Sequence, residues 1–364
     1  MRSLLVSITL LAAAVSLSAR PNLRQIADVA SFERETSITP YGSRKIVIEG
    51  ARSIRLEIRG TRSGSRLWIG GDDATALEPF EGAEGVTWSP TVQGSTAYLV
   101  SEEPVTLSIV RAAVGTTEAQ SNACLSDVAC SAPEDDEEIS RASRAIAMIR
   151  FVRGNASYVC TGALISDEAG SGTPYFLTAH HCISTPEEAA SIEAVWDERS
   201  PACGLQPRSI RTYGAELLVS SAETDVALLR LRRIPADRTF LKIERAPLRE
   251  GTPVYRLAHG DGAPMQYSAG VIRESGASCP TAPRSRFLYT APTAGAVSKG
   301  SSGAPLLLPG LRVAGQLFGL CGASPENPCA TYNEAVDGSL AASWPLLEPY
   351  LDRPEAARRR AARP

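Results

Sequence analysis

The distribution of cysteine constrains this chain more than any other feature of its sequence. Eight cysteines form an even set, and every one of them lies after residue 123: Cys124, Cys130, Cys160, Cys182, Cys203, Cys279, Cys321 and Cys329. In an exported chain an even set indicates disulfides. A zinc site is the alternative, but it requires paired C-x2-C or histidine spacings that this sequence lacks. We therefore expect disulfides, no metal and no cofactor, in a C-terminal region that differs from the cysteine-free N-terminal region.

The first 19 residues have the pattern of a secretory signal peptide. Arg2 is followed by an apolar stretch from Leu4 and by small residues up to Ala19. A membrane anchor is the alternative, but about 16 weakly apolar residues fall short of the roughly 20 that span a bilayer. We expect a secreted or periplasmic protein with no membrane attachment once residues 1–19 are removed. The net charge of -3 also lacks the basic excess that nucleic-acid binding requires.

The N-terminal region, residues 25–113, shows the period of two that is typical of half-buried strands. Ile54, Leu56 and Ile58 alternate with polar residues, and glycines separate the strand segments. This pattern predicts a small β-sandwich. Its role is left open between a pro-segment, a folding chaperone and a binding module. Trp88 suits a sugar site if it is exposed, but a buried core position is favoured for a tryptophan.

Residues 114–140 read as a linker, with an acidic run at 134–138 that indicates a solvated turn or the start of a helix. At the other end, residues 353–364 read as a basic, disordered tail. Between them, Gly and Pro turns separate strand-like segments, so we expect an all-β barrel or pair of barrels. These strand-like segments are Ala145 to Val152, Tyr158 to Ile165, Tyr175 to Thr178, Asp225 to Leu231 and Val313 to Leu317.

Three short segments of this second region carry candidate catalytic groups. An apolar strand ends at His181, a second apolar strand opens with Asp225, and Ser302 lies between Gly300 and Gly303. A histidine can act as a base that a carboxylate orients, and flanking glycines leave backbone N–H groups free for an oxyanion. The serine turn of α/β-hydrolases requires a following helix and the order Ser, Asp, His. The order here and the β-rich context favour the chymotrypsin arrangement instead.

From about Asn122 to Leu351 the chain resembles the trypsin-like serine endopeptidases, and among them the bacterial lysyl-endopeptidase branch. The segments that carry the resemblance are the cysteine pair of Ala123 to Cys130, Cys160 to Ile165, FLTAHHC through Cys182, Thr224 to Val226, GSSGAP around Ser302, and Arg312 to Leu317.

The resemblance implies a chymotrypsin-like double β-barrel over residues 122–352, made as a precursor. It also implies that His181 is the base, that Asp225 orients it and that Ser302 is the nucleophile. The backbone N–H groups of Gly300 and Ser302 would then form the oxyanion hole. His180 would be a neighbour without a catalytic role, and His259 would be structural.

The resemblance also implies a disulfide pattern. It pairs Cys160 with Cys182 and Cys130 with Cys203. Two alternatives stay open for the other four cysteines: Cys124 with Cys321 and Cys279 with Cys329, or Cys124 with Cys329 and Cys279 with Cys321.

The sequence departs from the family at the residues that would read the substrate. Ala335 stands where the lysyl branch has an acid, Ala296 stands where trypsin has one, and Phe318 replaces a family histidine. We therefore expect a small or apolar residue at the cleaved position, with a basic residue bound through Glu334 or Asp337 as the alternative. The remaining residues expected to bind substrate are Leu317 and Gly319.

Together these features predict a secreted, monomeric serine endopeptidase that hydrolyses protein or peptide substrates through an acyl-enzyme. The alternative is a catalytically silent or slow binding protein on the same fold, in which the N-terminal β-sandwich recognises the partner.

Overall fold

A computed structural model of the 364-residue chain describes residues 18–20, 23–72, 76–115, 124–131, 137–276 and 278–352. Strands dominate these residues, which confirms the predicted all-β class. Most of the expected signal peptide and all of the expected basic tail, 353–364, lie outside the described residues. No helix in the described ranges is both long and apolar enough to cross a membrane.

The N-terminal region forms a β-sandwich. One sheet has the order β3-β9-β5-β6, and the facing layer is made by β2, β10, β4 and β7, with β8 paired to β4. Fully buried aliphatic side chains such as Ile54, Leu56 and Leu99 fill the space between the layers. The strands of the sandwich are β2 (Arg24–Ile38), β3 (Ser43–Val47), β4 (Ser53–Arg59), β5 (Arg66–Gly70), β6 (Glu78–Glu81), β7 (Val86–Trp88), β8 (Val92–Gln93), β9 (Thr96–Ser101) and β10 (Val105–Gly115). The short strand β1 (Ser18–Arg20) precedes them and pairs with a strand of the C-terminal region.

Strand β4 differs from the half-buried strand that its alternation predicts. The apolar residues face the sandwich core as expected, but Arg55 and Glu57 on the other face are also buried. The ring of Trp88 lies 5.5 Å from the Arg55 guanidinium and 5.6 Å from that of Arg111, so cation–π contacts cover this face. Trp88 itself is buried, which removes the sugar-binding alternative based on an exposed ring.

The remaining strands lie in two sheets, one in each half of the C-terminal region, and the first of them is continuous with the β2-containing layer of the sandwich. In the first half, β11 to β17 curve around a core that includes Phe151, Phe176 and Trp196. In the second half, β23 pairs with both β22 and β24, which closes the order β23-β22-β19-β20-β21-β24 into a barrel. The strands are β11 (Ile146–Arg153), β12 (Ala156–Ile165), β13 (Tyr175–Ala179), β14 (Glu193–Trp196), β15 (Ile210–Tyr213), β16 (Ala215–Ser221), β17 (Val226–Leu231), β18 (Lys242–Ile243), β19 (Pro253–Ala258), β20 (Gln266–Ile272), β21 (Phe287–Ala294), β22 (Pro305–Leu308), β23 (Arg312–Gly322) and β24 (Glu334–Ser339).

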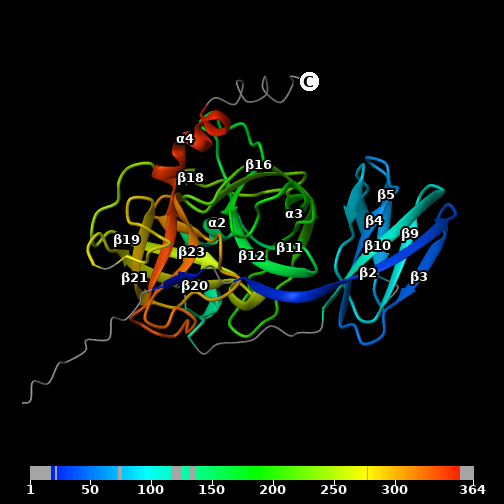
Figure 1. Cartoon of the computed structure of the whole chain (residues 1–364), viewed down its shortest axis with the longest axis horizontal. Helices are drawn as coiled ribbons and strands as arrows, with labels where there is room; N and C mark the ends of the chain where they lie inside the picture. The colour runs from blue at the N-terminus through cyan, green and yellow to red at the C-terminus, as the bar shows by residue number, and fades with distance from the viewer. Residues whose placement is uncertain are drawn as a thin grey trace, which may run out of the picture.

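The sandwich and the first of these sheets share one long strand. Strand β2 pairs with β10 inside the sandwich, and its first residues pair with β12, Arg24 opposite Val159 and Asp28 opposite Ala156. Figure 1 shows β2 running from the C-terminal region, where it lies beside β12, out to the sandwich. The N-terminal region is therefore joined to the rest of the molecule by a continuous sheet.

Helices are few and short, and four disulfides tie the C-terminal region together. The helices are α1 (Val128–Ser131), α2 (Glu137–Ser143), α3 (Pro186–Ala190), α4 (Leu340–Leu351) and the 3-10 turn η1 (Gly260–Gly262). Within the predicted linker, 114–140, α1 lies wholly inside and α2 begins at Glu137, at the end of the acidic run whose first three residues lie outside the described ranges. The disulfides are Cys130–Cys203, Cys160–Cys182, Cys124–Cys329 and Cys279–Cys321, so the second of the two open pairings is the one present.

Candidate active site

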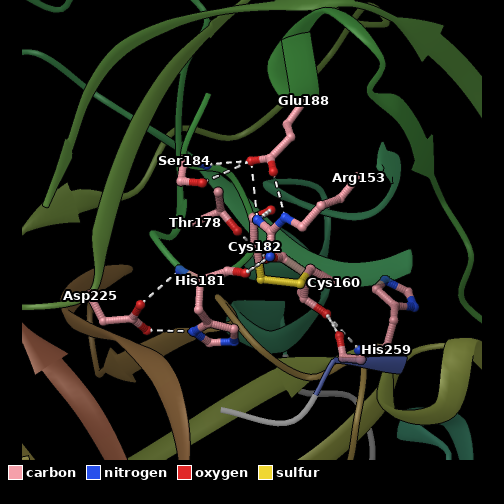
Figure 2. The surroundings of a disulfide bond; sticks show 11 residues. Arg153, Cys160, Thr178, His181, Cys182, Ser184, Glu188, Asp225 and His259 are labelled. Atoms are coloured by element: carbon pink, nitrogen blue, oxygen red, sulfur yellow. Dashed lines mark hydrogen bonds and ion pairs between the residues drawn. A yellow bond between two sulfur atoms is a disulfide. The ribbon is translucent and has the colours of Figure 1, made fainter. Parts of the chain in front are cut away.

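The loop that carries His181 is fixed from both sides. It follows β13, whose five residues are all buried, and the next residue, Cys182, is bonded to Cys160 on β12. From the opposite side, the Arg153 guanidinium donates to the backbone oxygens of His181 at 2.9 Å and Cys182 at 2.8 Å. Arg153 is itself paired with Glu188 (Figure 2). The position of the imidazole is thus set by a disulfide and a charged network before any substrate arrives.

Glu188 is the anchor of that network. It accepts from Arg153 and from the backbone N–H of Ser184 at 2.7 Å, and it closes a capping box with Thr185 at the start of α3. Burial alone would raise the pKa of Glu188, but the hydrogen bonds from Arg153 and Ser184 outweigh it and lower this pKa. The carboxylate therefore stays charged and keeps Arg153 in place.

The His181 and Asp225 side chains form the central contact of the site. One carboxylate oxygen of Asp225 lies 2.8 Å from Nδ1 of His181, and the other accepts the His181 backbone N–H at 2.9 Å (Figure 2). Asp225 is 2% exposed. A buried carboxylate bound to Nδ1 fixes the ring orientation and leaves Nε2 directed away from the carboxylate.

Asp225 is itself held by its backbone. It has a φ of 52°, a left-handed conformation that costs a non-glycine residue on the order of 1 kcal/mol and that is frequent at functional sites. Its carbonyl oxygen accepts from the backbone of His180 at 2.8 Å and from the buried amide of Gln316 at 3.1 Å. These contacts offset the strain and connect Asp225 to β23 of the second barrel.

The turn around Ser302 requires glycine on both sides. Gly300 and Gly303 have φ values of 99° and 80°, and a Cβ on Gly303 would lie 2.3 Å from the Thr178 hydroxyl and 2.4 Å from the Thr161 carbonyl oxygen. The serine turn is therefore packed against the end of β13, the strand that leads to His181. The Thr161 backbone N–H donates to the Ser302 carbonyl at 2.8 Å, and its hydroxyl donates to the Gly300 carbonyl at 2.9 Å.

The groups expected to act on a substrate are free of other hydrogen bonds. Among the described residues, neither the Gly300 N–H nor the Ser302 N–H donates to any acceptor. Nε2 of His181 is buried and also has no hydrogen-bond partner there, so the Ser302 hydroxyl does not bond to it in this conformation. Such contacts often tighten only when substrate binds.

The other two histidines lie in different surroundings. Nδ1 of His180 lies 2.7 Å from the Ser220 hydroxyl. His259 is fully buried, with Nδ1 3.1 Å from the Ala263 carbonyl, and burial lowers its pKa to about 4. His259 is therefore neutral at ordinary pH and packs behind the serine turn, as a structural residue would.

Phe318, expected to stand in place of a family histidine, contacts the imidazole of His181. The rings of Phe318 and His181 meet edge to face with centroids 5.9 Å apart, and Phe287 lies 5.4 Å from Phe318 on the other side. Leu317, the preceding residue, accepts the Gly303 N–H through its carbonyl at 2.8 Å. The start of the strand segment Phe318–Gly322 is thereby tied to both His181 and the serine turn.

A small cavity of about 100 Å³ lies beside this strand segment. Ala296 and Ala335 both line it, together with Val297 and Leu320, so the two positions where we looked for a substrate-binding acid lie on one apolar cavity. Arg256 also lines this cavity. The cavity is therefore mostly apolar, with a positive charge at one wall.

The two acids named as alternatives for binding a basic residue are both engaged. Asp337 is fully buried, and both of its oxygens accept from Arg256, at 2.6 and 2.7 Å. Glu334 lies 3.5 Å from the Arg284 guanidinium. Burial raises the pKa of Asp337 and of Glu334.

The sequence analysis did not predict the supporting contacts of three residues: Arg153, Thr161 and Gln316. Their partners are backbone atoms of His181, Gly300 and Asp225, far away in sequence, and no local pattern marks such contacts. Of the supporting elements, only α3 is marked by a local sequence pattern, because Thr185, Pro186 and Glu188 have the spacing of a helix start with a capping box.

Comparison with known proteins places much of the C-terminal region in a family. Residues 118–334, more than half of the chain, match the model of the family "Lysyl endopeptidase, C-terminal domain". A lysyl endopeptidase of Pseudomonas aeruginosa is 26% identical over 269 residues, which are 62% of this chain and 57% of that protein. The match thus spans little more than half the length of this relative. A secreted RxLR effector protein of Plasmopara viticola is 31% identical over 98 residues, 25% of this chain and 23% of that protein.

Solved structures with similar folds include the HtrA-type protease AlgW with a tripeptide, with a TM-score of 0.44 and 17% identity over 61% of this chain and 65% of that one. The active form of the Rv3671c protease from M. tuberculosis has a TM-score of 0.41 and 17% identity, over 64% of this chain and 92% of that one. From the family match, the chain belongs to the family of the lysyl endopeptidase C-terminal domain.

Proposed function

We propose that this protein is a secreted serine endopeptidase in which His181, Asp225 and Ser302 form the catalytic triad. The observation that carries the proposal is the double contact of Asp225 with the ring and the backbone of His181, which leaves Nε2 directed away from the carboxylate. The adjacent serine turn and the family membership support the same assignment. The four disulfides and the signal-like N-terminus support export to a secreted or periplasmic location.

The roles of the residues follow from their geometry. Nε2 of His181 accepts the proton of the Ser302 hydroxyl as its oxygen attacks the carbonyl carbon of a peptide bond. The N–H groups of Gly300 and Ser302 donate to the oxyanion that forms. His181 then gives its proton to the leaving amine, and a water molecule hydrolyses the acyl-enzyme that remains. Asp225 keeps the ring oriented and stabilises its protonated form throughout.

The proposal includes a preference for a small or apolar residue at the cleaved position. Ala296, Val297 and Ala335 make the adjacent cavity apolar and limit its size. A basic side chain would lie near the Arg256 guanidinium there, and Asp337 is already paired with Arg256, so it is not available to bind that side chain. Profiling a peptide library tests this point. A strong preference for Lys or Arg would contradict it.

We also propose that residues 122–352 are the protease and residues 25–113 an accessory or pro-domain of the precursor. Incubation with a fluorophosphonate probe tests whether the protein has an activated serine, because only such a serine attacks the probe. We expect labelling of the full chain, loss of labelling in Ser302→Ala, and labelling retained in the matched control Ser301→Ala. Full-length protein that folds but is never labelled would instead favour the binding-protein alternative.

A further inference from the structure

A second cavity, of about 350 Å³, is lined by both the sandwich and the first half of the protease region. On the sandwich side its walls include Arg55 of β4 and Gly115 of β10. On the protease side they include Arg150 of β11 and Val159 of β12, and Asp261 of η1 completes the lining. A ligand in this cavity would therefore contact both regions at once.

The charged side chains of the wall are mostly positive. Four arginines line the cavity, and Asp261 is the acid among the described lining residues; the arginines are Arg24, Arg52, Arg55 and Arg150. The Arg150 guanidinium is already paired with Glu193 at 3.2 Å, and Arg24 and Arg52 have partners of their own. An excess of positive charge on one concave wall attracts anions.

Arg55 differs from the other three arginines because its terminal nitrogens are unused. The residue is 3% exposed, and its Nε donates to the Ser89 carbonyl at 2.8 Å. Both terminal nitrogens are buried, and neither has a hydrogen-bond partner in the parts of the chain that the structure describes. Burial lowers the pKa of Arg55, and the charge of Glu193 only partly offsets this effect. A buried guanidinium without a bonded anion is costly, so a bound anion would relieve that cost.

The free donors of Arg55 suit an anion with several oxygens. A guanidinium is a planar fork whose N–H groups can bind two oxygens of a carboxylate or phosphate together. A water molecule takes up about 30 Å³ in the liquid, so the cavity has room for such an ion with several waters. Size and charge both fit a small oxyanion.

We infer that a free oxyanion of the phosphate type binds in this cavity through the terminal N–H groups of Arg55 and links the sandwich to the protease region. The inference is independent of the proposed catalytic activity, because Arg55 lies outside the candidate catalytic site. Glu193 does not replace the anion. Its hydrogen bonds go to Arg150 and Thr91, and it has none with Arg55.

Titration of the full chain with inorganic phosphate tests the inference. We expect saturable binding of one phosphate by calorimetry. Phosphate at about ten times its Kd should raise the Tm by about 2 °C, because the ion binds the folded state alone. Sodium chloride at the same ionic strength controls for screening and should not reproduce the rise. Absence of saturable binding, or an equal rise with chloride, would overturn the site.

Variants of the two arginines on Trp88 locate the binding. Arg55→Met removes the charge but keeps an apolar side chain against the ring, and we expect the Kd for phosphate to rise at least about tenfold. Arg111→Met is the matched control, because Arg111 contacts the same ring but does not line the cavity; its Kd should equal that of the parent. Arg55→Lys keeps the charge without the fork, so it should bind severalfold more weakly even if Arg55→Met does not fold.

Two results would refute the assignment to Arg55. Equal affinity in the parent and in the Arg55 variants would mean an adventitious ion only. Binding that appears in Glu118→Gln but not in the parent would mean that the chain supplies its own carboxylate, from a residue that follows Gly115 in sequence and lies outside the described ranges. A free anion would then have no place in the native protein.

Discussion

Glu193 offers the sharpest test of how the sandwich is held on the protease region. It belongs to β14 of the first sheet and is fully buried. Its two carboxylate oxygens accept from the Thr91 backbone N–H and from the Thr91 hydroxyl, both at 2.8 Å, across the boundary with the sandwich. Arg150 donates to it at 3.2 Å, and the Arg211 guanidinium lies 3.7 Å away. We predict that Glu193→Gln weakens this interface.

The magnitude follows from the pKa of Glu193. Burial alone would raise it, but the charges of Arg150, Arg55 and Arg211 outweigh burial and lower it from 4.5 to about 2. A difference of about 2.5 between the unfolded and folded pKa values corresponds to about 3 kcal/mol of stability, at about 1.4 kcal/mol for each pH unit. Because the folded pKa is the lower one, this stability is present above pH 4.5 and is lost as the pH falls towards 2.

Urea unfolding of the parent and of Glu193→Gln at several pH values measures this contribution. We expect the variant to be less stable by about 3 kcal/mol at pH 7, and the difference to shrink to about 1 kcal/mol at pH 3. Glu216→Gln is the control, since its pair with Arg230 is half-exposed and should contribute less than about 1 kcal/mol at either pH. A difference between parent and Glu193→Gln that does not depend on pH would refute the reasoning.

Three further predictions concern the catalytic region. His181→Ala should abolish peptide hydrolysis, whereas His180→Ala should retain most of it, measured as kcat/KM on one peptide. If His180→Ala were the more damaging change, the assignment of His181 as the base would be wrong. Gly303→Ala should lower the free energy of unfolding by at least about 2 kcal/mol, because a Cβ at this positive φ collides with the backbone of β12. Gly310→Ala, also at positive φ but with only Nε of Arg312 near the added Cβ, at 3.9 Å, should cost only about 1 kcal/mol. Alkylation of the unreduced protein should find no free thiol, and two or more labelled cysteines would contradict the disulfide set.

The three candidate catalytic segments could be found in the sequence because each depends on a local pattern. The apolar run before His181, the aspartate that opens β17 and the glycines around Ser302 each need only neighbouring residues to be recognised. The alternation in the sandwich likewise predicted the strands correctly. What it missed was the burial of Arg55 and Glu57, because the second face of β4 is covered by parts of the chain that follow it.

Contacts between distant segments could not be predicted from the sequence. The choice between two pairings of Cys124 and Cys279 depends on which loops meet in space. The pairing of Asp337 with Arg256 joins β24 to β19, and it removes an acid that the sequence left available for substrate. Nothing in the sequence around Arg24 indicates that it lies opposite Val159.

The long strand β2 has a consequence for the order in which the chain folds. All strands of the sandwich lie before residue 116, so they can pair as soon as that part of the chain has emerged during synthesis. The first residues of β2 can pair only after β12 has been synthesised, since Asp28 and its partner Ala156 are 128 positions apart. Until then they present an open edge, which we expect to act as a template for the hairpin of β11 and β12. A protease region produced without the sandwich would have to fold with the edge of β12 exposed to other chains.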